Sequence, residues 1–221
     1  MTPDLIPLHV DASLLVFDKP AGLLCVPGRG PDKQDCLSAR AAAQWPDAKV
    51  VHRLDMATSG LVLMARGIES QRALNLAFEK RRVHKRYTAV VCGALGNDPF
   101  YPLSEDGWHT IDLPLLLDWQ NRPRSVVNPT EGKPSLTRWR LAESQPSDPP
   151  GTTRLTLEPI TGRSHQLRVH LQAIGHPIVG DPLYGTAQPE PAQRLLLHAE
   201  GIRFPHPATG EAMAFVAPCP F

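Results

Sequence analysis

The order of apolar runs along the chain limits the possible folds more than any other feature of the sequence. Short strand-like runs lie at 14–17, 61–66, 87–92, 136–141, 153–157 and 195–199, and helical stripes lie only at 36–44, 68–82 and 164–174. Strands and helices do not alternate strictly, and several strand pairs have hairpin-like connections. This order predicts an α+β fold with a large, mainly antiparallel or mixed β-sheet flanked by helices and loops, rather than a doubly wound one.

Local signals refine this prediction at two places. A Pro-Ala-Gly turn at 20–22 is followed by two leucines, which predicts a second short strand at 23–24. The helix at 164–174 is expected to end at Gly175, because Pro177 follows two residues later.

Composition indicates one soluble domain spanning residues 1–221. Hydrophobic residues make up 42% of the 221 residues, and no apolar run approaches the ~18 residues of a membrane span. The start, 1–5, lacks the basic and apolar stretches of a secretory signal, so we expect a cytoplasmic protein. The 24 prolines concentrate at 98–102, 145–151 and 189–191, which we expect to be short loops rather than linkers.

The cysteines do not indicate a structural metal or a disulfide framework, because they lie far apart and include no C-x-x-C pair. They are Cys25, Cys36, Cys92 and Cys219.

One carboxylate stands in an unusual setting. Residues 52–60 read His-Arg-Leu-Asp-Met-Ala-Thr-Ser-Gly, so Asp55 follows Arg53 and precedes a turn of small residues. An aspartate in a turn most often bonds nearby backbone amides. This loop is flanked by Val50 and Val51 on one side and by an apolar run on the other, and polar residues between buried strands are often functional. Both interpretations remain open from these residues alone.

A basic run precedes the strand at 87–92. The formal net charge is only +1, so the total charge does not indicate a nucleic-acid partner. Cations at a helix end complement the helix dipole, which is the simpler explanation. The run leads directly into a strand bearing Tyr87, and this arrangement favours contact with a nucleic-acid backbone. Taken alone, Tyr87 would most often be a half-buried packing residue. The five cations are Lys80, Arg81, Arg82, Lys85 and Arg86.

Polar side chains also gather at the start of the helix at 164–174. The cations among them lie where the helix dipole disfavours them, which indicates a nearby anion such as Asp55 or a phosphate. An ordinary polar surface helix is the alternative. We do not expect a metal site from His165, His170, His176 and His198, since their spacing lacks an i, i+4 ligand pair. The polar residues of this helix start are Arg163, His165, Gln166, Arg168 and His170.

Together with the segments 175–185 and 195–199, these motifs resemble, in order, the motif set of RluA-type pseudouridine synthases over roughly 14–217. The Asp-Trp-Gln-Asn-Arg-Pro at 118–123 and the Gly-Lys-Pro at 132–134 also resemble the short members that modify both ribosomal and transfer RNA. The resemblance implies a pseudouridine synthase fold without the S4-like domain of many relatives. It also implies an isomerase of structured RNA that uses no cofactor. We expect a monomer.

The resemblance implies roles for individual residues. Asp55 is the essential residue, as nucleophile or base, and Tyr87 lies against the uracil and removes the proton from carbon 5. Arg168 is the expected ion-pair partner that lowers the pKa of Asp55. The target base is flipped out of its stack, and Arg53 fills the gap or holds a phosphate. The residues predicted to bind RNA are Arg53, His52, Lys80, Arg81, Arg82, Lys85, Arg86, Asn121, Arg122, Arg163, His165, Gln166 and Leu197.

Two other functions fit these residues less well. A non-catalytic RNA-binding module that assists ribosome assembly would use the basic run and Tyr87, but it would not need a carboxylate loop, which repels phosphate. A hydrolase using Asp55 and the histidines lacks metal-ligand spacing or a Ser/His nucleophile arrangement.

Overall fold

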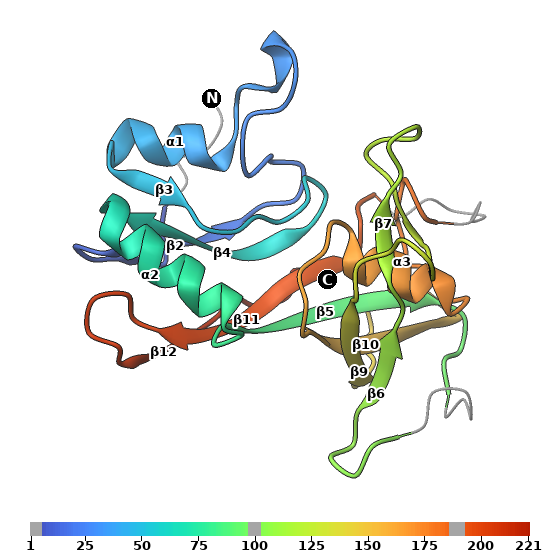
Figure 1. Cartoon of the computed structure of the whole chain (residues 1–221). Helices are drawn as coiled ribbons and strands as arrows, with labels where there is room; N and C mark the ends of the chain where they lie inside the picture. The colour runs from blue at the N-terminus through green and yellow to red at the C-terminus, as the bar shows by residue number, and fades with distance from the viewer. Residues whose placement is uncertain (1–5, 97–102, 186–192) are drawn as a thin grey trace. The chain divides into compact units, whose positions relative to one another are not determined.

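A computed structural model describes residues 6–96, 103–185 and 193–221. The expected loops at 98–102 and 189–191, and the start at 1–5, lie outside the described residues. Ten described strands belong to one β-sheet and two more form a small second sheet, with a few helices beside them (Figure 1). The predicted α+β class is therefore confirmed. Within the described residues, none of the helices is long and apolar enough to cross a membrane.

The chain divides into two compact units. The first comprises Met1–Lys85 and Ala199–Cys219, and the second comprises Arg86–His198 and Pro220–Phe221. The single domain expected over residues 1–221 stays a prediction, and each unit is described by itself below.

In the first unit the strand order is β1-β2-β4-β11, with β3 beside β4 and β12 beside β11. Strands β2 and β4 are antiparallel, as are β3 and β4, and β11 and β12. The elements are β1 (His9–Val10), β2 (Leu14–Lys19), a 3-10 turn (Pro31–Lys33), α1 (Leu37–Gln44), β3 (Ala48–Val50), β4 (Ser59–Arg66), α2 (Gly67–Glu79), β11 (Leu197–Pro205) and β12 (Ala212–Val216).

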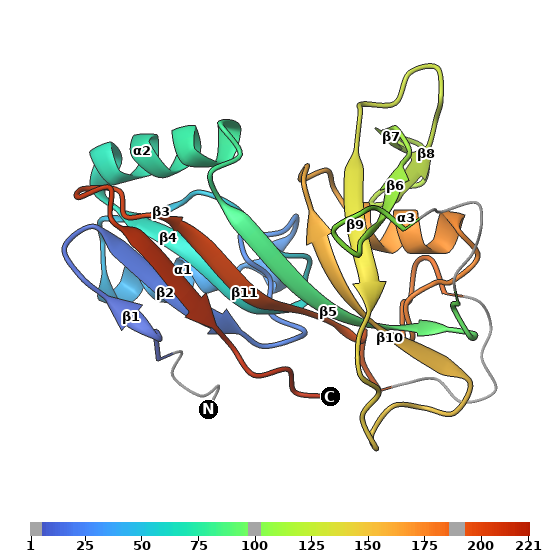
Figure 2. The same cartoon turned by 90° about the horizontal axis from the view of Figure 1, so that it is seen from below.

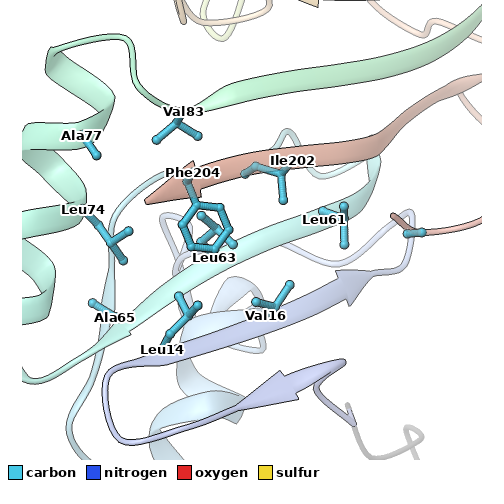
Figure 3. Close-up of a cluster of buried hydrophobic side chains, with 11 residues drawn as sticks. Leu14, Val16, Leu61, Leu63, Ala65, Leu74, Ala77, Val83, Ile202 and Phe204 are labelled. Carbon is cyan, nitrogen blue, oxygen red and sulfur yellow. The ribbon is translucent and has the colours of Figure 1, made fainter. Parts of the chain in front are cut away.

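Strand β4 is buried on both faces, which explains its unbroken apolar sequence. On one face, Leu61 and Leu63 pack in a cluster with Leu74 of α2 (Figure 3). On the other face lies Val62, paired with Phe17 of β2, whose ring meets Trp45 at the end of α1 with centroids 6.1 Å apart. The two helices thus cover opposite faces of β2 and β4 (Figures 1 and 2).

In the second unit the strands follow the order β5-β10-β9-β6, and each neighbouring pair is antiparallel. The β7–β8 hairpin forms the small separate sheet. Helix α3 contacts β8, β9 and β10 (Figure 2). The elements are β5 (His84–Cys92), β6 (His109–Asp112), β7 (Leu115–Leu117), β8 (Ser125–Val127), β9 (Leu136–Leu141), β10 (Thr152–Pro159) and α3 (Gln166–Ala173). The predicted hairpin of 136–141 with 153–157 is confirmed by the β9–β10 pairing.

Two predicted helix bounds were wrong for the same reason. Helix α2 ends at Glu79, because Arg81 adopts a left-handed backbone with φ 55°, and the amides of Arg81 and Arg82 donate back into the last turn. Helix α3 begins at Gln166 rather than Ser164, because His165 is also left-handed, with φ 56°. The expected end of α3 is confirmed, since the Gly175 amide donates to the Gln172 carbonyl at φ 85°.

Two strand predictions also needed correction. Residues 23–24 form no strand; Leu24 makes only an isolated bridge to Cys36, because its carbonyl caps the start of α1 at Leu37. Strand β11 continues to Pro205, well beyond the apolar run at 195–199, because it pairs with β12 there.

Candidate active site

The loop that carries Asp55 joins β3 to β4, and its backbone is fixed on both sides of that residue. The Leu54 amide donates to the Cys25 sulfur at 3.2 Å. The Met56 carbonyl accepts from the Gly22 amide at 2.8 Å and from Lys19 Nζ at 3.2 Å. Asp55 itself is half-buried, and its own carbonyl accepts the Thr58 amide at 3.1 Å. The segment at 19–25 therefore holds the chain that presents this carboxylate.

Lys19 is the centre of this support. Its side chain is 0% exposed, and its ammonium donates to the carbonyls of Pro20 and Leu23, both at 2.8 Å, as well as to Met56. A buried ammonium is tolerated only where its protons are bonded. Sequence reasoning did not single out Lys19. A lysine ending an apolar strand, just before a Pro-Ala-Gly turn, was the available signal.

His52 anchors the same loop to β4. Its Nε2 accepts the Leu63 amide at 2.9 Å, replacing the partner that β3 no longer supplies beyond Val50. Burial and the positive charge of Lys85 lower the pKa of His52 to about 3, so the ring is neutral near pH 7. Burial also lowers the pKa of Lys85 to about 8. The predicted contact of His52 with RNA stays a prediction, and its observed role is structural.

Charged groups surround the Cys25 thiol. Burial raises its pKa, and the charges of Lys19, Asp55 and Arg53 all act on it. The sulfur therefore serves here as a neutral hydrogen-bond acceptor for the loop. Arg53 is exposed, while its neighbour Leu54 is buried. The loop thus offers a guanidinium to solvent beside the half-buried Asp55.

In the second unit, Arg168 forms a buried two-pronged pair with Asp181. Nε and Nη2 of Arg168 each lie 2.7 Å from a carboxylate oxygen, and both side chains are at most 3% exposed. The carboxylate also accepts the amides of Leu183 and Tyr184. Burial acts to raise the pKa of Asp181, but these hydrogen bonds and the guanidinium charge hold it below its usual range. Asp181 thereby fixes the plane of the Arg168 guanidinium.

Tyr184 completes this support at the start of α3. Its ring lies 5.1 Å from the Arg168 guanidinium carbon, and its hydroxyl accepts the Ser125 amide at 2.7 Å. The hydroxyl is also 2.8 Å from Nδ1 of His165, the left-handed residue before the helix. Sequence reasoning missed Asp181 and Tyr184 because alone they are ordinary residues of a turn.

Gln166 and His170 are structural within this unit. The Gln166 amide bonds Thr161, the Arg163 amide, the Leu136 carbonyl and Thr137, all within 3.0 Å. Both nitrogens of His170 are also bonded, and burial lowers its pKa. Contact of Gln166 with RNA stays a prediction, although its amide already has partners inside the fold.

The remaining predicted residues divide by exposure. Tyr87 is buried on β5, opposite Leu157 of β10, and Leu197 is 3% exposed. Arg168 and Asp55 belong to different units, so the ion pair expected between them stays a prediction. Among the described residues, no group of three or more His, Cys, Asp or Glu is placed to hold a metal ion. The exposed cations and amide are Lys80, Arg81, Arg82, Arg86, Asn121, Arg122 and Arg163.

Comparison with known proteins identifies the family to which this chain belongs. The model of the RNA pseudouridylate synthase family matches residues 13–173. The chain therefore belongs to the RNA pseudouridylate synthase family, whose members are isomerases.

The relatives narrow this to the RluA type. The chain is 43% identical over 220 residues to the dual-specificity RNA pseudouridine synthase RluA of Escherichia coli (strain K12), covering 99% of this chain and 95% of that protein. It is 44% identical over 215 residues to the protein of that name from Vibrio cholerae serotype O1, covering 97% and 82%. The solved structure of human RNA pseudouridylate synthase domain containing 1 matches with a TM-score of 0.76 at 28% identity, covering 100% of this chain and 87% of that one. The resemblance predicted from the motifs is confirmed.

Proposed function

We propose that this enzyme converts specific uridines of ribosomal RNA, transfer RNA or both into pseudouridine, with Asp55 as the essential residue. The observation that carries the proposal is the anchoring of the backbone on both sides of Asp55, by Cys25 on one side and by Lys19 and Gly22 on the other. A loop fixed in this way presents a half-buried carboxylate in one position, as catalysis by positioning requires. The relatives named dual-specificity RNA pseudouridine synthases support more than one kind of RNA substrate, and the motifs at 118–123 and 132–134 suggest ribosomal and transfer RNA.

The reaction breaks the N-glycosidic bond of a uridine, turns the uracil and joins carbon 5 to the ribose. Atoms and electrons balance within the nucleoside, since the proton leaving carbon 5 is matched by one gained at the released nitrogen. Asp55 begins the exchange by attacking the ribose or by removing a sugar proton. Tyr87 takes up the carbon 5 proton, and its burial in β5 holds the ring in place for this step. Arg168 supplies the positive charge that keeps the carboxylate ionised.

The RNA is held by cations. Exposed Lys80, Arg82 and Arg86 bind phosphates at one place along the chain, and Arg163 does so at another. Arg53 occupies the position of the extruded base, whose extrusion costs a few kcal/mol. We place the enzyme in the cytoplasm, as a monomer.

Replacement of Asp55 by Asn tests the proposal. The variant has nearly the same shape and lacks the charge, so it should bind RNA as wild type does and form no pseudouridine. Chemical mapping of pseudouridine in total ribosomal and transfer RNA, without added metal, measures the product. Asp18→Asn, at an exposed position on β2, is the matched control and should keep full activity.

The same assay separates the alternatives. Turnover by Asp55→Asn removes that residue from the mechanism. Wild-type protein that binds RNA tightly and forms no pseudouridine would instead be the binding module considered from the sequence.

A further inference from the structure

The turn between β7 and β8, residues 118–124, carries an aromatic side chain that the mechanism does not use. Trp119 is 66% exposed, whereas Trp108 and Trp139 are buried and Trp45 is half-buried. The Arg122 guanidinium carbon lies 3.2 Å from the centre of the Trp119 ring. We call this pair the Trp119–Arg122 platform. The Trp119 ring is therefore available to a flat ligand, with a cation already stacked on it.

The turn holds the platform in a fixed shape. The Asp118 amide donates to the Arg124 carbonyl at 2.9 Å, and the Arg124 amide donates to the Asn121 carbonyl at 3.1 Å. The Asp118 carboxylate accepts the amides of Gln120 and Asn121 and the side chain of Asn121. The side-chain hydrogen bond from Asn121 is the main cause that lowers the pKa of Asp118. The only acid of the turn is thus ionised and bonded within it.

The base of the turn is tied to the support of Arg168. Arg124 donates to the Leu183 carbonyl, and its guanidinium carbon lies 5.5 Å from the centre of the Tyr184 ring. The Ser125 amide, the first of β8, donates to the Tyr184 hydroxyl. The platform therefore stands on the same residues that fix the start of α3, while it belongs to a sheet separate from the one that carries Tyr87.

The chemistry of the platform fits an unpaired nucleobase with its phosphate. A guanidinium stacked on an indole keeps its N–H donors around the rim, where they can reach phosphate oxygens while the open face of the indole accepts a flat ring. The neighbours of Trp119 along the turn are Gln120, Asn121 and two arginines, which make a polar and cationic surface instead of an apolar patch for a protein partner. Aromatic side chains beside cations are the usual stacking sites for single-stranded RNA.

We propose that the Trp119–Arg122 platform binds an unpaired base of the substrate RNA, other than the target uridine, by stacking on Trp119 and pairing its phosphate with Arg122. This inference rests on the proposed function. It adds to that function a recognition site for looped RNA.

Binding and catalysis are measured separately to test it, on an RNA hairpin that contains a uridine that the enzyme converts and an unpaired loop. Trp119→Ala should raise the dissociation constant about 5- to 150-fold, the range measured for loss of one stacked base. Trp119→Phe should keep most of the affinity. The single-turnover rate at saturating RNA should not change, because the platform does not touch the reacting ring. Leu141→Ala, which removes an exposed apolar side chain of the same unit, is the control and should bind as wild type does.

Two further measurements identify the ligand. Trp119→Ala should leave the salt dependence of binding unchanged, while Arg122→Ala should reduce the slope of log K against log salt by about 0.7–0.9, the effect of one phosphate contact. A fully paired RNA of equal length should show no dependence on Trp119. Equal loss on paired and looped RNA, or wild-type affinity of Trp119→Ala, would overturn the platform. Failure of wild type to form pseudouridine would instead overturn the proposed function, because binding to looped RNA is tested independently.

Discussion

Arg81 shows at the residue scale how function and stability oppose each other. Its left-handed backbone would suit glycine, and a side chain there costs of order 1 kcal/mol. Arg81 nevertheless carries a positive charge here, within the basic run at 80–86. A strained exposed residue of this kind points to a role outside the fold.

We therefore expect Arg81→Gly to raise the free energy of unfolding by up to about 1 kcal/mol and to weaken RNA binding. Urea unfolding and filter binding at two salt concentrations measure the two effects. Arg82→Ala removes an equal charge from a residue without this strain, so it should weaken binding with no gain in stability. A loss of stability in Arg81→Gly would show that the side chain supports the fold.

Asp181 fixes the guanidinium of Arg168, which we propose to act in catalysis. Asp181→Asn removes the charge that faces Arg168 and should lower stability by about 3 kcal/mol, as breaking a buried pair does. It should also shift the pH–rate profile, because in the proposed mechanism the oriented Arg168 guanidinium keeps the Asp55 carboxylate ionised. Asp35→Asn, in an exposed pair with Arg40, is the control and should leave both unchanged. A purely structural Asp181 would move the unfolding curve and not the profile.

At the scale of elements, periodic apolar patterning predicted the strands, whereas helix ends that depend on the conformation of a single residue were missed. The run at 61–66 and the hairpin of 136–141 with 153–157 were readable because apolar patterning alone defines them. The ends of α2 and α3 were not, because Arg81 and His165 take a backbone conformation that glycine usually signals.

In the candidate site, too, the features set by local sequence were predictable, and those set by long-range contacts were not. The motif around Asp55 was recognisable, and so was the polar start of α3. The burial of Lys19 and the enclosure of Gln166 depend on residues far away in the chain, such as Met56 and Leu136. Such long-range contacts cannot be predicted from composition or from the spacing of motifs. Lysine and glutamine are usually exposed, so burial of Lys19 and Gln166 was not expected, and Gln166 was predicted to bind RNA.

Gly60, at the start of β4, is required by the approach of β11. A Cβ at this position would lie 2.4 Å from the Ala199 carbonyl oxygen, and its φ of +113° is one that side chains rarely adopt. Gly60→Ala should therefore lower the free energy of unfolding by about 2–4 kcal/mol. Gly67→Ala is the matched control: its φ is +74°, but a Cβ would meet nothing within 4 Å, so it should cost only about 1 kcal/mol. Equal losses in thermal or urea unfolding would mean that β11 yields to the new methyl group.

For the whole molecule, His52 makes stability depend on pH. Its pKa is about 3 in the fold and near 6.5 when unfolded, so between these values the unfolded chain binds a proton that the folded chain does not. The stabilisation is complete above pH 6.5 and declines as the pH falls. We expect a loss on the order of 2 kcal/mol between pH 7 and pH 5. His52→Gln, which keeps an acceptor for the Leu63 amide, should flatten this part of the curve; an unchanged slope would show that another group titrates there.

Asp11 adds a second, more acidic transition. It binds His9 and His206 and accepts the amides of Ser13 and Leu14. Although burial opposes the shift, these bonds lower the pKa of Asp11 from 3.8 to about 2. Its contribution is present above pH 4 and disappears as the pH falls toward 2. Acid unfolding of Asp11→Asn should lack this step, while the His52 step near pH 5 remains; a curve unchanged below pH 4 would assign the step elsewhere.

The segment 19–25 anchors the backbone at residues 54 and 56, so we expect a substitution confined to Asp55 to leave the path of the loop unchanged. In a cell that makes both the normal enzyme and a variant altered only at Asp55, the two proteins should therefore bind the same RNA with equal affinity. The inactive variant would compete with the active enzyme for the target uridines. Pseudouridine formation would then fall as the amount of the variant rises.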